Sequence, residues 1–322
     1  MKVDDRVAKR LRLKKKPMII LICLVVIIIG VVFGLNKYQD YVYKNTTEYK
    51  LTEMGYTQEE IELFKSVLNK EVFEALLNQP KMVHLSSLLK EKYYLNKNLE
   101  KYLAYMNKNK IMTNLSDVVA LVNVGADNPW YENIQEADTS KEYAILVNKF
   151  YRLSEEYVPD DLISVSNLYA YEGHQIREEA LIHFIDMFEE AREEGLKFVI
   201  NSSYRSYDSQ KQTYDNAEKY NGKEYADNYA AHPGHSEHQS GLAIDIAKYG
   251  SNVDFSTTDE HAWLINNAHR FGFILRYPQD KEYITGYKYE AWHFRYVGVE
   301  IATIIKQENI TFDEYYAFYI DK

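Results

Sequence analysis

Residues 232–247 combine three histidines with a carboxylate that lies in an apolar run. The stretch from Leu242 to Ala247 has the length and composition of a short buried strand, in which alternate side chains face opposite sides. Asp245 then shares its face with alanines. Because a carboxylate on such a face is destabilising unless its charge is balanced, we expect a ligand beside it. A metal ion is the simplest such ligand, and the small alanines leave room for it.

A second titratable group follows in an aromatic run near residue 290. A zinc site for hydrolysis needs three nitrogen or oxygen ligands, an open position for water, and a nearby carboxylate that accepts the water's proton. The residues that meet these needs are His238, Asp245 and His293 as ligands and Glu290 as the base. Glu290 and His293 are three apart and would face opposite sides of a regular strand. Either the backbone bends near Ala291, or Glu290 reaches in from the end of a loop.

These two blocks resemble the zinc D,D-carboxypeptidases of the VanY type. The first block is His238-x-x-Gly241-x-Ala243-x-Asp245 and the second is Glu290-x-Trp292-His293. The wider group includes VanX-like dipeptidases, phage L-alanyl-D-glutamate endopeptidases and the hedgehog signalling domain. The resemblance extends to Ser203-Tyr204-Arg205-Ser206-x-x-x-Gln210 and to Tyr296-Val297-Gly298, and covers residues 160–322. Ala291 stands where these enzymes usually carry a proline, a difference that concerns the stiffness of the loop.

The resemblance implies roles for four further residues. Arg205 is expected to face the scissile peptide and to stabilise the oxyanion, which agrees with the effect of a fixed guanidinium in a dry site. Gln210 and Ser203 belong to the same block as Arg205. Ser236 resembles a serine that contacts substrate in these enzymes. Gln210, Ser203 and Ser236 are therefore candidate substrate-binding residues.

The two remaining histidines of the first block, His232 and His235, are also near the expected metal. Only His238 keeps the seven-residue distance to Asp245 that the family uses. We therefore interpret His232 and His235 as loop residues or as hydrogen-bond donors behind the ligands. Whether either assists the metal is left open by the sequence.

The activity implied by the resemblance is Zn²⁺-dependent removal of the C-terminal D-alanine from peptidoglycan stem peptides, a D,D-carboxypeptidase reaction. An L,D-carboxypeptidase that shortens tetrapeptide stems uses similar blocks, and the residues do not separate the two. An endopeptidase that cuts within bridges is a third alternative. A non-catalytic cell-wall binding module on the same fold is an interpretation of another class. It predicts the loss of a ligand, the base or the arginine, and all five are present.

The amino terminus has a basic segment, 1–16, followed by an apolar run from Met18 to Leu35 that contains no charged residue. Eighteen helical residues are about 27 Å long, close to the thickness of a hydrocarbon core. We predict a single transmembrane anchor over 17–36, with the amino terminus in the cytoplasm and the catalytic domain outside the cell. A cleaved signal peptide is the alternative, disfavoured by the length of the run and the lack of a small-x-small site. The single cysteine, Cys23, lies in this run and excludes an intramolecular disulfide.

The chain carries a net charge of −10. Without residues 1–16 it has 30 basic and 46 acidic residues, a net charge of −16. Such an acidic portion argues against nucleic acid and against anionic surfaces as partners. The expected partners are stem peptides and, through the amino-terminal helix, the membrane; the sequence does not identify a protein partner.

The carboxyl-terminal half predicts an α+β domain, 159–322, with a small antiparallel sheet, flanking helices and zinc at the sheet face. A long amphipathic helix is predicted from Arg177 to Gly195, where the glycine provides a C-cap. Strands are predicted at 198–200, 242–247, 273–275 and 294–297, and helices at 263–272, 303–305 and 312–319.

Residues 37–158 predict a mostly helical extracellular domain, a spacer or a partner-binding domain, that ends where Pro159 and acidic neighbours break the pattern. Thr57 and Glu60 have the spacing of a capping box. Helices are predicted over 84–94 and 98–107. The apolar run 118–124 is interpreted as a strand.

Overall fold

The computed structural model describes residues 4–110 and 114–321, with side chains from Met18 onward. The side chains of the predicted basic tail, 1–16, lie outside the described part of the chain. The chain divides into two compact units, Met1–Lys90 and Glu91–Lys322. Residues 91–158 thus belong to the same unit as the candidate site, whereas the domain boundary predicted from the sequence lies between residues 158 and 159.

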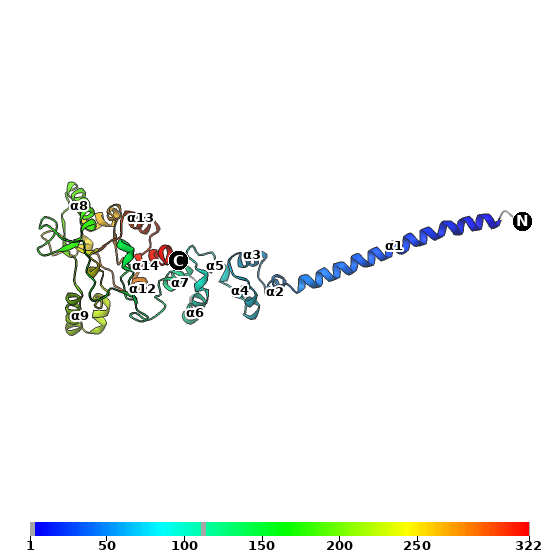
Figure 1. Ribbon diagram of the computed structural model, residues 1–322, viewed down its shortest axis with the longest axis horizontal. Helices are drawn as coiled ribbons and strands as arrows, with labels where there is room; N and C mark the ends of the chain where they lie inside the picture. Colours follow the sequence, from blue (N-terminus) through cyan, green and yellow to red (C-terminus); the bar gives the residue numbers. More distant parts are fainter. Residues whose placement is uncertain (1–3, 111–113, 322) are drawn as a thin grey trace. The chain divides into compact units, whose positions relative to one another are not determined.

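The first unit contains the long helix α1 (Asp4–Lys44), drawn in blue in Figure 1. Its part Met18–Lys44 is long enough to cross a membrane and contains an 18-residue window with a mean hydropathy of 3.4, and a signal sequence has the same properties. The predicted apolar helix is therefore present. The helices that follow are short: α2 (Thr47–Glu53), α3 (Gln58–Val67), α4 (Lys70–Ala75) and α5 (Leu85–Leu88).

Two local predictions in this unit have different outcomes. The capping box is confirmed, because the Glu60 amide donates to Thr57 Oγ1 at 3.2 Å and the Thr57 amide donates to Glu60 Oε2 at 2.8 Å. The helix predicted over 84–94 is too long, since α5 ends at Leu88. The single turn of α5, with Leu89 at its end, is enough to bury Leu85, Leu88 and Leu89. The spacing of these leucines therefore does not require a longer helix.

The second unit begins with two helices, α6 (Leu99–Asn109), close to the predicted 98–107, and α7 (Leu115–Asn123). The strand predicted over 118–124 is therefore wrong. Val118, Val119, Leu121 and Val122 are buried on several sides of α7. A short apolar run buried all round has no period that separates a helix from a strand. The Asn114 side chain caps α7 by accepting from the Asp117 amide at 3.4 Å.

A four-stranded antiparallel sheet carries the candidate site. Its strand order is β5 (Phe198–Ser202), β6 (Ala243–Lys248), β8 (His293–Tyr296) and β7 (Phe273–Leu275). Asp245 pairs directly with His293, and Ile244 pairs with Phe294. Paired residues point to the same face of a sheet, so one face is apolar and the other carries the two titratable residues. Two smaller sheets are β1 (Gln135–Glu136) with β2 (Tyr151–Arg152), and β3 (Leu162–Ser164) with β4 (Gln175–Arg177).

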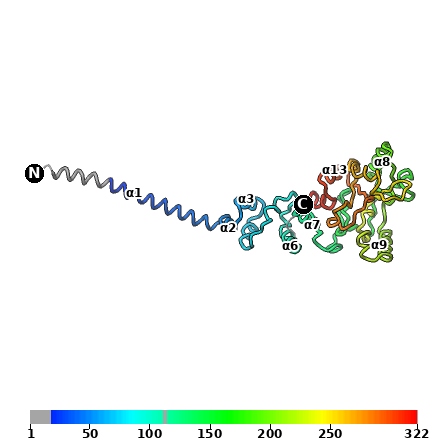
Figure 2. The backbone as a smooth tube through the Cα atoms, turned by 180° about the vertical axis from the view of Figure 1, so that it is seen from behind, coloured from blue at the N-terminus to red at the C-terminus, as the bar shows by residue number. Residues whose placement is uncertain are grey.

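The apolar face packs against α8 (Glu178–Glu193), which agrees with the helix predicted from Arg177 to Gly195. Phe184 and Met187 of α8 are fully buried against Ile244 and Phe294 of the sheet. Helices α8 and α9 lie at opposite edges of the unit in both views (Figures 1 and 2). The remaining helices are α9 (Tyr207–Asn221), α10 (Lys223–Tyr229), α11 (Asp259–Asn267), α12 (Glu282–Thr285), α13 (Val299–Glu308) and α14 (Phe312–Tyr315).

Candidate metal centre

Three predicted ligands, one from a turn and two from the sheet, meet on its polar face. One ligand atom each from His238, Asp245 and His293 lies within 4.8 Å of the other two. His238 comes from the 3₁₀ turn Glu237–Ser240, and its Nε2 is 3.5 Å from Asp245 Oδ1. His293 Nδ1 is 3.2 Å from the same oxygen. The antiparallel register of β6 and β8 therefore brings together side chains that are 48 residues apart in the sequence.

The hydrogen bonds of the two imidazoles leave one nitrogen of each facing Asp245. His238 Nδ1 is 2.7 Å from the Ser203 carbonyl oxygen, which can only accept, so the proton is on Nδ1 and Nε2 is a free acceptor. His293 Nε2 lies 3.4 Å from Glu237 Oε2, which leaves Nδ1 for a ligand. In each case the second nitrogen is held in the way that metal-binding histidines are usually held.

Asp245 completes a donor set that fits a cation. Its Oδ1 is buried and accepts no hydrogen bond from any described residue. Burial opposes its charge, but His238 and His293 nevertheless hold the pKa of Asp245 well below its usual range. Two imidazole nitrogens and one carboxylate oxygen are a set that Zn²⁺ prefers, with a fourth position left for water.

Glu237 is a buried residue that the sequence analysis did not single out. Its carboxylate accepts from Arg276 Nε at 2.7 Å and from Arg295 Nη1 at 2.9 Å, and all three side chains are 0% exposed. Burial opposes its charge, yet the two guanidiniums keep the pKa of Glu237 far below normal. Glu237 thereby fixes the ring of His293. Two features of the sequence point to Glu237. It is adjacent to His238, and two arginines, Arg276 and Arg295, lie directly after or within apolar strand segments.

Glu290 lies just before β8, at the edge of the ligand group. Residues 291–292 form a turn, so the predicted bend near Ala291 is confirmed. Glu290 Oε2 is 3.6 Å from His293 Nδ1, and the residue is 9% exposed. Burial, assisted by the nearby charges of Asp245 and Glu237, raises the pKa of Glu290 to about 7 against the opposing effect of His293.

Arg205 follows β5 and lines the same cavity as the ligands and Glu290. The cavity has a volume of about 210 Å³. Arg205 Nη1 donates to Gln210 Oε1 at 2.8 Å, and Nη2 donates to Ser202 Oγ at 3.1 Å. The guanidinium is therefore held in one orientation beside the ligands, as oxyanion stabilisation requires.

The three candidate substrate-binding residues have different positions. Ser236 lines the cavity. Gln210 also lines it, but its Oε1 accepts from Arg205 and its Nε2 donates to the Ala231 carbonyl at 2.7 Å, so Gln210 supports the site from its wall. The Ser203 hydroxyl lies 3.1 Å from His174 Nδ1, away from the cavity lining, and it is the Ser203 carbonyl that holds His238.

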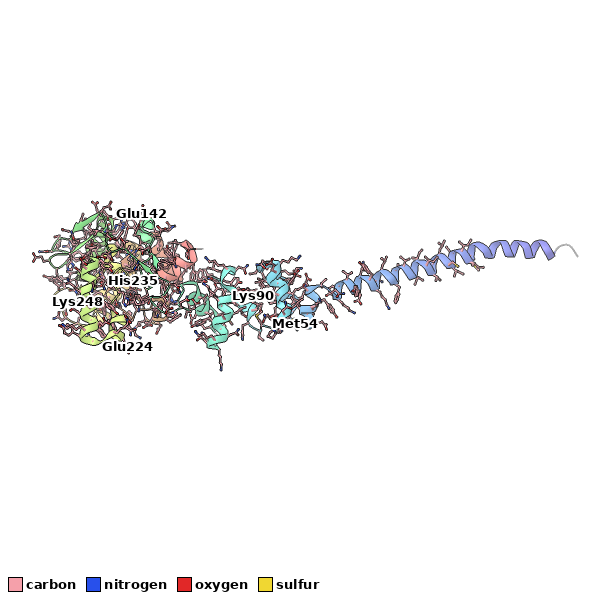
Figure 3. The ribbon with its side chains drawn as sticks, turned by 60° about the horizontal axis from the view of Figure 1, so that its bottom comes forward. Met54, Lys90, Glu142, Glu224, His235 and Lys248 are labelled. Carbon is pink, nitrogen blue, oxygen red and sulfur yellow. The ribbon has the colours of Figure 1, made fainter. Side chains whose placement is uncertain are left out.

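His232 and His235 lie outside the metal-binding group found in the described part of the chain. His235 Nδ1 is 2.7 Å from the Asn148 carbonyl, and Figure 3 labels His235 inside the unit and Glu224 at its edge. His232 Nε2 is 2.9 Å from Asp227 Oδ1. Both rings are thus engaged with protein groups.

Known proteins resemble this chain in sequence. Residues 173–299 match the family model described as VanY, D-alanyl-D-alanine carboxypeptidase. The chain is 41% identical over 179 residues to YodJ of Bacillus subtilis, covering 53% of this chain and 66% of YodJ, less than two thirds of that protein. It is 36% identical over 203 residues to a D-alanyl-D-alanine carboxypeptidase of Enterococcus faecalis, covering 59% of this chain and 73% of the relative.

Among solved structures, the LdcB LD-carboxypeptidase is similar with a TM-score of 0.54 and 37% sequence identity. The similarity covers 58% of this chain and 91% of the LdcB chain. The antiparallel sheet with flanking helices therefore belongs to a known fold.

We predict that Glu237→Gln weakens Zn²⁺ binding by roughly 10–100-fold, because the carboxylate that orients His293 is lost. Competition with a chromophoric chelator measures this affinity. The exposed Glu193→Gln on α8 is the matched control and should bind Zn²⁺ like the unchanged chain. A folded Glu237→Gln variant with unchanged affinity would contradict the role of Glu237.

Proposed function

Because the chain belongs to the VanY family of D-alanyl-D-alanine carboxypeptidases, we propose that it hydrolyses the last peptide bond of peptidoglycan stem peptides and releases D-alanine. The observation that carries this proposal is the convergence of His238, Asp245 and His293 with Glu290 and Arg205 around one cavity. The ligands are proposed to hold Zn²⁺, which when bound polarises a carbonyl and acidifies water.

The chain's own residues then have separate tasks in the hydrolysis. Glu290 takes the proton from the attacking water and returns it to the leaving amine, a task suited to a carboxyl group whose pKa is about 7. Arg205, fixed by Gln210 and Ser202, stabilises the negative oxygen that develops on the scissile carbonyl. Ser236 lies on the cavity wall and is available to bind the substrate.

An L,D-carboxypeptidase is the second candidate, favoured by the similarity to the LdcB LD-carboxypeptidase. Muropeptides of defined length separate the two activities. We expect the Zn²⁺-loaded chain to remove the fifth residue of a pentapeptide stem, which mass spectrometry of the products detects. Loss of the fourth residue from a tetrapeptide would instead assign the L,D activity. Cleavage of neither peptide would leave the endopeptidase and the non-catalytic binding module as the two alternatives.

We predict that Glu290→Gln lowers kcat by about a hundredfold to ten-thousandfold while Zn²⁺ stays bound, because the amide cannot accept the water's proton. His293→Ala should lose the metal itself, since it removes one of three ligands. Metal content by atomic emission, measured beside D-alanine release, separates the two effects. Full turnover by purified Glu290→Gln would exclude Glu290 as the base.

We also propose that α1 anchors the chain in a membrane as a single span, with the amino terminus in the cytoplasm and the catalytic unit outside the cell. The apolar run from Met18 to Leu35, which lies in this helix, and the basic residues before it support this placement. An uncleaved anchor predicts a membrane-bound chain of 37.9 kDa that only detergent releases, which fractionation and intact-mass measurement check. A shorter, soluble mature chain would indicate a cleaved signal peptide instead.

A further inference from the structure

Lys149 is a buried lysine behind the wall of the catalytic cavity. It is 3% exposed and precedes β2. Its Nζ donates to the Asp227 carbonyl oxygen at 2.7 Å, the one side-chain hydrogen bond of Lys149 among the described residues. Burial lowers the pKa of Lys149 to about 8, although the charge of Asp227 opposes this effect. Burying a charged ammonium group is unfavourable, so the groups that Lys149 contacts should explain why the lysine is there.

Three aromatic rings surround the Lys149 ammonium. The Nζ atom lies 4.5 Å from the ring centroid of Tyr287, 5.3 Å from that of Tyr131 and 5.7 Å from that of Trp130. Distances below about 6 Å allow each ring face to stabilise the cation. The packing is close, because a Cβ on Gly286 would come within 2.9 Å of Lys149 Cδ and 3.1 Å of Trp130.

The two partners of Lys149, Tyr287 and Asp227, both belong to segments that line the catalytic cavity. Tyr287 lines the cavity directly. Asp227 lies in α10, and the residues that follow it, Tyr229, Ala230 and Ala231, line the cavity as well. One ammonium group thus joins two wall segments that are about sixty residues apart in the sequence.

The Asp227 side of this junction is itself fixed by hydrogen bonds. Its carboxylate is 2.6 Å from the Tyr214 hydroxyl and 2.9 Å from His232 Nε2, and the His232 ring stacks on Tyr131 at 3.7 Å between centroids. The Asp227 side chain is therefore held independently of Lys149, so a change at Lys149 releases only the link between the Asp227 carbonyl oxygen and the Tyr287 ring.

We propose that Lys149 is a positioning residue for substrate binding, which sets the geometry of the cavity by holding Tyr287 and the end of α10 together. The inference rests on the proposed peptidase function and names a residue outside the family match at 173–299. Lys149 lies behind Tyr287 and touches neither the ligands nor Glu290, so its effect falls on substrate binding rather than on the chemical step.

The test is Lys149→Met in the full-length Zn²⁺-loaded chain, since methionine keeps much of the apolar stem and removes the charged donor. We expect KM for the cleaved stem peptide to rise roughly tenfold, the scale of one lost charge-assisted hydrogen bond, with kcat changed less than about twofold. Calorimetry of the same peptide in a Glu290→Gln background should show the same roughly tenfold loss of affinity without any turnover.

Lys281→Met is the matched control. Lys281 is a partly buried lysine of the same unit whose Nζ donates to Glu314 at 3.0 and 3.2 Å, and it does not line the cavity. Its loss should lower the melting temperature and leave KM unchanged. An equal rise of KM in the control, or an unchanged KM in folded Lys149→Met, overturns the inference. Loss of Zn²⁺ together with kcat in Lys149→Met also overturns it.

Lys149→Gln decides the matter if Lys149→Met does not fold, because it keeps a donor near the Asp227 carbonyl oxygen and removes the charge that the three aromatic rings surround. A rise of KM with kcat and Zn²⁺ retained supports the inference, and an unchanged KM overturns it. If the unchanged chain cleaves neither pentapeptide nor tetrapeptide, the proposed function fails. If the unchanged chain is active and folded Lys149→Met has the same KM, this inference fails while the proposed function stands.

Discussion

The site depends on how the buried charge of Asp245 is balanced. The pairing of β6 with β8 places His293 beside this carboxylate, and the turn before β6 places His238 there. Its Oδ1 lies 3.2 Å from His293 Nδ1 and 3.5 Å from His238 Nε2 but accepts no hydrogen bond from a described residue. Buried acceptors are rarely left in this state. A divalent cation shared by the three side chains accounts for their geometry.

The same balance of charge extends away from the ligands. Glu237 lies between Arg276 and Arg295, and Arg276 in turn donates to Asp313 Oδ2 at 2.6 Å. Removing one member of such a buried group leaves the others without compensation, which typically destabilises a protein by about 3–5 kcal/mol. Because Glu237 is held by both arginines, its carboxylate can hold His293 in one orientation.

Residues before the family match contribute to this arrangement. Arg295 Nη2 donates to the carbonyl oxygens of Tyr143 and Ile145, and Asn148 Nδ2 donates to Asp313 at 2.8 Å. Together with Lys149, this segment supports the site from behind. Its contacts explain why residues 91–158 form one compact unit with the sheet, although the proline and acidic residues near 159 resemble a linker.

The sequence by itself offers His238, Asp245 and His293 as candidate metal ligands through their residue types. It also predicts features that are set within a few residues: the two faces of β6, the helix that ends before Gly195 and the bend before His293. These follow from side-chain period, capping and steric rules that act within a few residues. The run 118–124 was misread because burial on all sides removes the period. The roles of Glu237 and Lys149 were decided only by the tertiary structure. Their partners, Arg276, Arg295, Asp227 and Tyr287, lie tens of residues away, and only the folded chain brings the opposite charges and the ring faces within contact distance.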